Sequence, residues 1–177
     1  MKPSTASFQV SFSLWVHFLG FFLKSIASKR WPLKINREES LGRALFSGNY
    51  DQNKGIIKIT AFKLKDPTKG ISVNRLTYAP ENQIDYLSKT EAQCRTDKAR
   101  KNNSMAGEIS FYGYAVIEAE VISTIKLDGM KSLGMEATPN YKNPFHGDIT
   151  LPVDDGKDFY LDIADKLQRI AKFKEPL

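Results

Sequence analysis

Apolar residues recur with two different periods along residues 37–177, and the changes of period mark the expected elements. Alternation with a period of two is typical of strands, and recurrence every three or four residues is typical of amphipathic helices. The pattern predicts strands in five segments: LGRALF after Arg37, residues 55–65, residues 71–78, residues 107–117 and the short segment GMEATPNY, which Pro139 ends.

Two of these predicted strands flank a turn sequence. DPTKG, residues 66–70, has a proline at an inner position and a closing glycine, which is the composition of a turn. Because β-branched segments precede and follow it, residues 55–65 and 71–78 are predicted to pair as a hairpin. Gly113, inside the aromatic-rich strand 107–117, predicts a bulge or a close approach of another backbone.

Three further segments predict helices. Pro80 suits the first turn of a helix, and this helix is expected to fade in the polar run at residues 95–104. A second helix is expected over residues 118–129. A third follows two aspartates, which favour a helix start, and runs to about residue 173 on an apolar stripe of Phe159, Ile163, Leu167 and Ile170. Strands mixed with helices in no βαβ rhythm indicate an α+β fold: one domain with a mixed or antiparallel sheet and two to three packed helices.

The first 36 residues have a different character and are treated as an N-terminal arm that precedes a globular domain at 37–177. No charged residue occurs from Pro3 to Leu23. Residues 8–23 fit a membrane span, which needs about 20 apolar residues, or the apolar part of a secretory signal. Their alternation of apolar and polar positions also fits a strand. The arm could instead reflect a start codon placed upstream of the true one.

Charge separates the arm from the domain. The net charge is +6, but the arm has five basic residues and no acidic ones, whereas residues 37–177 have 21 basic and 20 acidic residues. A nucleic-acid partner is therefore not supported for the nearly neutral domain. Basic residues after the apolar segment favour a cytoplasmic location for this flank. We expect a cytoplasmic protein, with membrane association through residues 8–23 as the alternative.

Few residues of the metal-binding or cofactor-binding types are present. Cys94 is the single cysteine, and His17 and His146 are the two histidines. An internal disulfide and a His/Cys metal site are therefore not expected. The glycine-rich phosphate loops GxxxxGK[ST] and GxGxxG do not occur in the sequence. We expect no metal and no cofactor.

The segment NPFHGDITLP, residues 143–152, contains the one histidine of the domain. Imidazole titrates near neutral pH, so His146 could act as a general base or acid, with Asp148 orienting the ring and Asn143 and Tyr141 nearby. The alternative is a structural turn that begins at Asn-Pro and ends at Gly147, with the ring hydrogen-bonded to backbone. The nucleophile motifs GxSxG and SxxK do not occur beside it.

Two arginines lie within or beside apolar strand segments. Arg43 in LGRALF and Arg75 in SVNRL each need a carboxylate, phosphate or carbonyl partner there. Both could bind an anionic ligand near His146. The alternative, which we favour, is a structural ion pair with Glu38, Glu39 or Asp148, or exposure at a strand end.

The domain resembles a group of small bacterial proteins to which no activity is assigned. The shared pattern contains GRALFS, AFKLKDPTKGISVNRL, FYGYAVI and ATPNYKNPFHGDITLP, followed by a final helix. It covers about residues 38–173, and NPFHGDI is its most distinctive part. The resemblance implies a discrete bacterial domain and brings no catalytic residues to carry over.

Two hypotheses about function follow from these observations. The first is a non-catalytic binding or accessory protein with an unknown protein or small anionic ligand as partner, acting through a surface near NPFHGDI. The second is a hydrolase or transferase on an anionic substrate, with His146 as general base and Arg43 or Arg75 binding the anion. Whether the protein is an enzyme is left open by the sequence.

Overall fold

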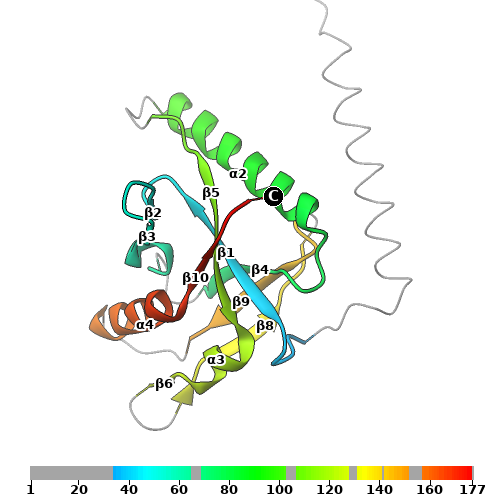
Figure 1. Ribbon diagram of the computed structural model, residues 1–177, viewed down its shortest axis with the longest axis vertical. Helices are drawn as coiled ribbons and strands as arrows, with labels where there is room; N and C mark the ends of the chain where they lie inside the picture. The colour runs from blue at the N-terminus through cyan, green and yellow to red at the C-terminus, as the bar shows by residue number, and fades with distance from the viewer. Residues whose placement is uncertain are drawn as a thin grey trace, which may run out of the picture. The chain divides into compact units, whose positions relative to one another are not determined.

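The computed structural model describes residues 34–64, 69–102, 107–127, 131–140, 142–151 and 157–176 of the 177-residue chain. They belong to one compact unit, Lys34–Leu177. A six-stranded antiparallel sheet with three helices forms this unit (Figure 1). The predicted α+β class is therefore confirmed.

The main sheet is built from strands that are far apart in the sequence. Its order is β10-β5-β1-β4-β9-β8, and every neighbouring pair is antiparallel. The strands are β1 (Ser40–Phe46), β4 (Ile71–Arg75), β5 (Phe111–Glu118), β8 (Gly134–Ala137), β9 (His146–Thr150) and β10 (Lys172–Lys174).

Helices and short hairpins lie between these strands. The helices are α2 (Glu81–Lys101), α3 (Ala119–Thr124) and α4 (Lys157–Ile170), with a 3-10 helix, η1 (Ile59–Ala61). Two hairpins connect longer elements: β2 (Tyr50–Asp51) with β3 (Ile56–Ile57), and β6 (Lys126–Leu127) with β7 (Lys131–Ser132).

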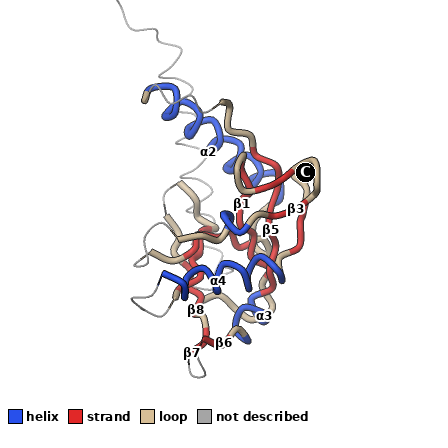
Figure 2. The backbone as a smooth tube through the Cα atoms, turned by 90° about the vertical axis from the view of Figure 1, so that its left-hand side faces the viewer, coloured by secondary structure: helices blue, strands red, loops and turns tan. Residues whose placement is uncertain are grey.

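The helices pack on opposite faces of the sheet because neighbouring strand residues point to opposite sides. Tyr114 of β5 contacts Asp85 and Ser88 of α2. Ala115, the next residue, belongs to the apolar core that also contains residues of α3 and α4. Figure 2 shows α2 apart from α3 and α4.

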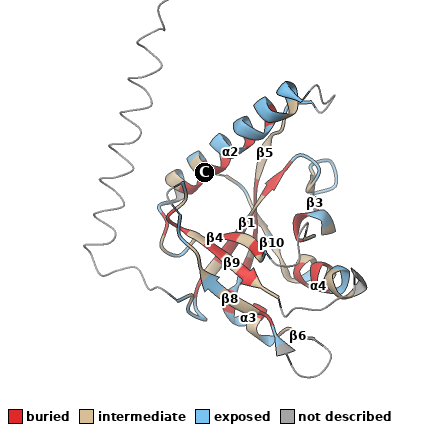
Figure 3. Ribbon diagram, turned by 180° about the vertical axis from the view of Figure 1, so that it is seen from behind, coloured by how far each residue is buried: buried red, intermediate tan, exposed pale blue. Residues whose placement is uncertain are grey.

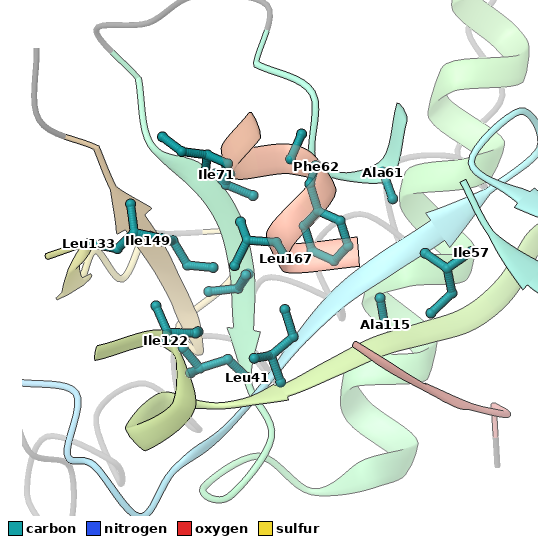
Figure 4. Close-up of a cluster of buried hydrophobic side chains, with 14 of the residues drawn as sticks. Leu41, Ile57, Ala61, Phe62, Ile71, Ala115, Ile122, Leu133, Ile149 and Leu167 are labelled. Atoms are coloured by element: carbon teal, nitrogen blue, oxygen red, sulfur yellow. The ribbon is translucent and has the colours of Figure 1, made fainter. Parts of the chain in front are cut away.

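The apolar core fills the α3/α4 side of the sheet. Its fully buried residues come from strands β1, β4, β5 and β9, from η1 and from the two helices (Figure 4), and they include Leu41, Phe62, Ile71, Ile122, Ile149, Ile163 and Leu167. Burial of each large apolar side chain in this way stabilises the folded state by about 1.5–3 kcal/mol. The outward side of α2 is exposed (Figure 3).

Gly113 produces the bulge that the sequence predicted. β1 pairs Leu45 with Gly113 and Phe46 with Phe111, so Tyr112 is the extra residue of β5. Gly113 has a φ of +133°, and a Cβ there would collide with the carbonyl oxygen of Lys174 in β10. The prediction of a bulge and of a close backbone approach is therefore confirmed.

The predicted strand at 55–65 and its hairpin with 71–78 are wrong. In the described part of this segment, the strand is limited to Ile56–Ile57, in the short hairpin with β2, and the 3-10 helix begins at Ile59. β4 pairs instead with β1 and β9. Ala61, the last residue of the 3-10 helix, and Phe62, which follows it, are both buried in the core that also contains α4 residues.

Helix ends also differ from the predictions. α2 continues through the polar run to Lys101, stabilised by Glu91–Arg95 and Gln93–Asp97 contacts four residues apart. α3 ends at Thr124, earlier than expected, and α4 ends at Ile170. Phe173 belongs to β10 because it pairs with Ala115 on the sheet edge. Residues 66–68 of the predicted turn at 66–70 and the aspartates at 154 and 155 lie outside the described residues.

Candidate functional site

Three of the six candidate site residues lie together on one face of the sheet. His146 and Asp148 are in β9, and Asn143 lies in the turn that leads into this strand. The sequence suggested that His146 is part of a turn that ends at Gly147. In the structure, His146 is the first residue of β9. Arg43 and Arg75 make other contacts, described below, and Tyr141 lies outside the described residues.

Strand register decides which side chains share this face. The backbone N–H of Arg75 donates to the carbonyl oxygen of Phe145 at 2.9 Å, so these two residues form a hydrogen-bonded pair. The next pair, Asn74 and His146, is therefore of the non-hydrogen-bonded kind, with Cα atoms only about 4.5 Å apart. Ser72 and Asp148 form the next such pair. A polar row on β4 thus faces a polar row on β9.

Thr138, just after β8, connects His146 with Asp148. The Thr138 hydroxyl donates to Asp148 Oδ2 at 2.6 Å and lies 2.8 Å from His146 Nδ1. His146 Nδ1 is also 3.1 Å from the Thr138 carbonyl oxygen and 3.8 Å from Asp148 Oδ2. The side chains of His146 and Asp148 are 21% and 20% exposed, so solvent reaches both.

These contacts determine which ring nitrogen carries the proton. A carbonyl oxygen and an ionised carboxylate can only accept hydrogen bonds. The Thr138 hydroxyl proton is directed to Asp148, so its oxygen accepts from His146, as does the Thr138 carbonyl. Nδ1 is therefore the donor, and neutral His146 has a bare Nε2, to which no described residue is hydrogen-bonded.

A second chain of hydrogen bonds fixes the orientation of Asn74. The backbone N–H of Phe145 donates to Asn143 Oδ1 at 3.0 Å, which leaves Asn143 Nδ2 as a donor. Asn143 Nδ2 donates to Asn74 Oδ1 at 2.6 Å. Nδ2 of Asn74 is therefore a donor with no partner in the described part of the chain. We name the set Asn74, Thr138, Asn143, His146 and Asp148 the polar strand-face site.

Arg75 is engaged in a buried ion pair instead of facing this site. Its Nε and Nη2 donate to the two carboxylate oxygens of Glu39 at 2.7 and 2.8 Å, and both side chains are almost fully buried. Nη2 also contacts the Lys34 carbonyl oxygen at 3.3 Å. Such a fork-to-fork pair holds the start of β1 against the end of β4.

Arg43 donates hydrogen bonds to backbone carbonyl groups near the point where the pairing of β1 with β4 ends. Its Nε donates to the Ala61 carbonyl oxygen at 3.1 Å, and Nη1 donates to the Ser72 carbonyl oxygen at 2.7 Å. Burial lowers the pKa of the guanidinium below its ordinary value, and Arg95 lowers it further, against smaller opposite effects from Glu91 and Asp148. Asp148 is thus an electrostatic neighbour of Arg43.

A separate buried polar cluster lies between α2 and β5. The Tyr114 hydroxyl donates to Asp85 Oδ1 at 2.8 Å and lies 3.1 Å from Ser88 Oγ. Burial raises the pKa of the Tyr114 phenol, and the contact with Asp85 raises it further, whereas the Ser88 hydrogen bond lowers it. Asp85 and Tyr114 line a cavity of about 10 Å³, roughly the space of one water molecule.

Sequence reasoning missed Asn74, Thr138, Asp85 and Ser88. Alternation within ISVNR could have placed Ser72 and Asn74 on one face. Thr138 carries no such signal, because its role depends on the register of β8 against β9.

No family model matches this sequence, and neither does a curated protein or a solved structure. Across the described ranges, no group of three or more His, Cys, Asp or Glu side chains is arranged to hold a metal ion. None of the helices in that part of the chain is long and apolar enough to cross a membrane, and residues 8–23 lie outside it. Function is therefore inferred from the geometry of the polar strand-face site.

Proposed function

We propose that this protein is a non-catalytic binding or accessory domain of a bacterial cytoplasm, and that its partner docks on the polar strand-face site. The observation that carries this proposal is the internal hydrogen bonding of the site. Side chains from β4, from β9, from the residue that follows β8 and from one turn hold one another in place, and His146 and Asp148 still reach solvent. Polar groups held in position before binding lose less conformational entropy on association.

Charge favours a protein partner over a small anion. Asp148 lies in the site, and Glu136, exposed on β8, pairs with Asp148 across the strands. Two carboxylates repel an anionic ligand. Arg75 donates to Glu39, one of the ion-pair partners that we favoured from the sequence. Arg43 donates to backbone carbonyl oxygens, which that alternative did not name.

Partner capture from cells tests this proposal. The tagged full-length chain is compared with His146→Ala and Asp148→Ala, and with Asp162→Ala as a matched control on the exposed surface of α4. We expect the captured set to be lost with the first two variants and kept with the control. Capture that both site variants leave unchanged would show that this surface does not bind the partner. Arg75→Ala is unsuitable, because its burial makes loss of folding the expected result.

A hydrolase or transferase with His146 as general base is the second candidate. One observation favours it: a proton held on Nδ1 by Thr138, with Asp148 behind it, leaves Nε2 free to accept a proton. This is the arrangement that a general base requires. Its anion-binding part has less support, since the described contacts of both arginines are to the protein itself.

Hydrolysis of 4-nitrophenyl acetate and 4-nitrophenyl phosphate separates the two candidates. An enzyme with this base would lose its rate on His146→Gln and retain part of it on Thr138→Val. The binding proposal predicts no hydrolysis that depends on His146. Hydrolysis that His146→Gln abolishes would therefore contradict the binding proposal and support the catalytic candidate.

A further inference from the structure

Two hydrogen-bond chains of the polar strand-face site end at adjacent side chains with opposite hydrogen-bonding character. One chain starts at the Phe145 backbone N–H and passes through Asn143 to Asn74. The other starts at the Asp148 carboxylate and passes through Thr138 to His146. Each chain begins at a group whose donor or acceptor role is fixed, so the roles of the terminal atoms follow.

The terminal atoms are a donor, Asn74 Nδ2, and an acceptor, His146 Nε2. Their residues are Cα partners on β4 and β9, and the pair is of the close, non-hydrogen-bonded kind. Side chains of such partners lie on the same face of the sheet. The donor and the acceptor therefore belong to neighbouring, partly exposed side chains on one face of the sheet.

We infer that the polar strand-face site binds an amide group of its partner through both atoms at once. A primary carboxamide supplies the complementary set from one group: its carbonyl oxygen accepts from Asn74 Nδ2, and the N–H on the same side as that oxygen donates to His146 Nε2. Asn and Gln side chains carry such a carboxamide. An extended peptide presents the same pair through the N–H and C=O of one residue, which belong to two successive trans amides and point to the same side. The inference rests on the proposed function and names the chemistry that the partner offers.

Charge argues for a peptide amide over a nucleotide, although some base edges also offer an adjacent donor and acceptor. A nucleotide would bring phosphates near Asp148 and the exposed Glu136 on the neighbouring strand, and like charges in proximity disfavour binding. An amide is neutral and meets no such repulsion.

Nuclear magnetic resonance titration of the full chain tests the inference with small probes. Acetamide represents the carboxamide, N-acetylglycine methylamide represents the peptide backbone, and methyl acetate keeps the carbonyl but lacks the N–H. We expect one or both amides to shift the Asn74 side-chain NH₂ signals and the His146 Nε2 signal. The amide that binds more tightly identifies the source. Methyl acetate is expected to bind about tenfold more weakly, the equivalent of one hydrogen bond.

Variants keep the test independent of folding. Asn74→Asp retains the acceptor for Asn143 and replaces the outward donor by an oxygen, so it should abolish amide binding. Asn102→Asp, beyond the end of α2, is the matched control and should leave binding unchanged. Thr138→Val removes the hydroxyl that contacts His146 Nδ1 and should weaken amide binding about tenfold. This variant provides a second test if Asn74→Asp does not fold.

Equal shifts with methyl acetate, no shifts with either amide, or binding of adenine in their place would overturn the inference. These outcomes are distinct from a failure of the proposed function. If the amides do not bind while partner capture still depends on His146 and Asp148, only the amide assignment is wrong. If partner capture does not depend on His146 or Asp148, the proposed function itself is wrong.

Discussion

Arg75 and Glu39 show how a single buried pair constrains the domain. Their side chains are 0% and 1% exposed, and two short hydrogen bonds join them. An ionised group without a partner at such a position is strongly unfavourable. The pair therefore fixes the start of β1 against β4, the strand that carries Asn74.

Removal of one partner tests this role. Glu39→Ala should lower the free energy of unfolding by about 3–5 kcal/mol, because it leaves the Arg75 charge buried and unpaired. The measurement is urea-induced unfolding. Lys166→Ala, which breaks an exposed pair with Asp162, should change stability by no more than about 0.5 kcal/mol. Similar losses in the two variants would contradict the account of Arg75.

Gly113 is the second residue with a defined structural requirement. Gly113→Ala places a Cβ against the Lys174 carbonyl oxygen at a φ of +133°, so stability should fall by about 1–3 kcal/mol. Protection of β10 amides against hydrogen exchange should fall with it. Gly107→Ala meets no atom within 4 Å and serves as the control. Undiminished protection of residues 172–174 in Gly113→Ala would contradict the close contact.

At the scale of elements, α2 is attached to the sheet through polar groups as well as apolar ones. Asp85 and Ser88 of the helix meet Tyr114 of β5 in the interior. Thr96, a further buried polar residue, donates to the Ala92 carbonyl oxygen and accepts from the Ile109 backbone N–H. The helix is therefore positioned by directional contacts, which fix its register on the sheet.

Tyr114→Phe tests the attachment of α2. Loss of the hydroxyl leaves the buried Asp85 with one partner fewer, so unfolding should require about 1–3 kcal/mol less. Tyr86→Phe, on the exposed side of the same helix at 49% exposure, should be neutral. An equal effect of the two substitutions in thermal or urea unfolding would argue against the Tyr114–Asp85 hydrogen bond.

Alkaline pH should destabilise the protein through the same group. The folded state raises the pKa of the Tyr114 phenol above its ordinary value, which is about 10 in an unfolded chain. The contribution of Tyr114 is therefore complete below about pH 10 and is lost as the pH rises further, because the unfolded state releases the proton first. Unfolding at a series of pH values above 9 should show a smaller decline for Tyr114→Phe than for the wild type.

Local patterns predicted the elements that neighbouring residues determine. The strands of GRALF and ISVNR, the bulge at Gly113 and the apolar stripe of α4 all follow from residues close in sequence. β10 and η1 were missed, because Phe173 is extended only through its pairing with β5, and Ala61 and Phe62 are buried together under α4. Contacts between distant segments decided these outcomes.

At the scale of the whole molecule, the sheet order creates the candidate site. β4 lies beside β9, and β9 lies beside β8, which brings Asn74 close to His146 and Thr138, more than sixty residues further along the chain. The sequence pointed to His146, Asp148 and Asn143 because they are neighbours in NPFHGD. Alternation could place Asn74 on one face of its strand, but its proximity to His146, and the role of Thr138, depend on strand order and register.

The tautomer of His146 is the most direct measure of this arrangement, because it depends on Thr138 and Asp148 being in place together. A long-range ¹H–¹⁵N correlation spectrum in alkaline solution, where a histidine ring carries one proton, identifies the protonated nitrogen, and His146→Gln assigns the signals. We expect the proton on Nδ1 and a bare Nε2 in the wild type, with a shift toward Nε2–H in Thr138→Val. A wild-type ring protonated on Nε2 would contradict the donor and acceptor roles assigned to the site.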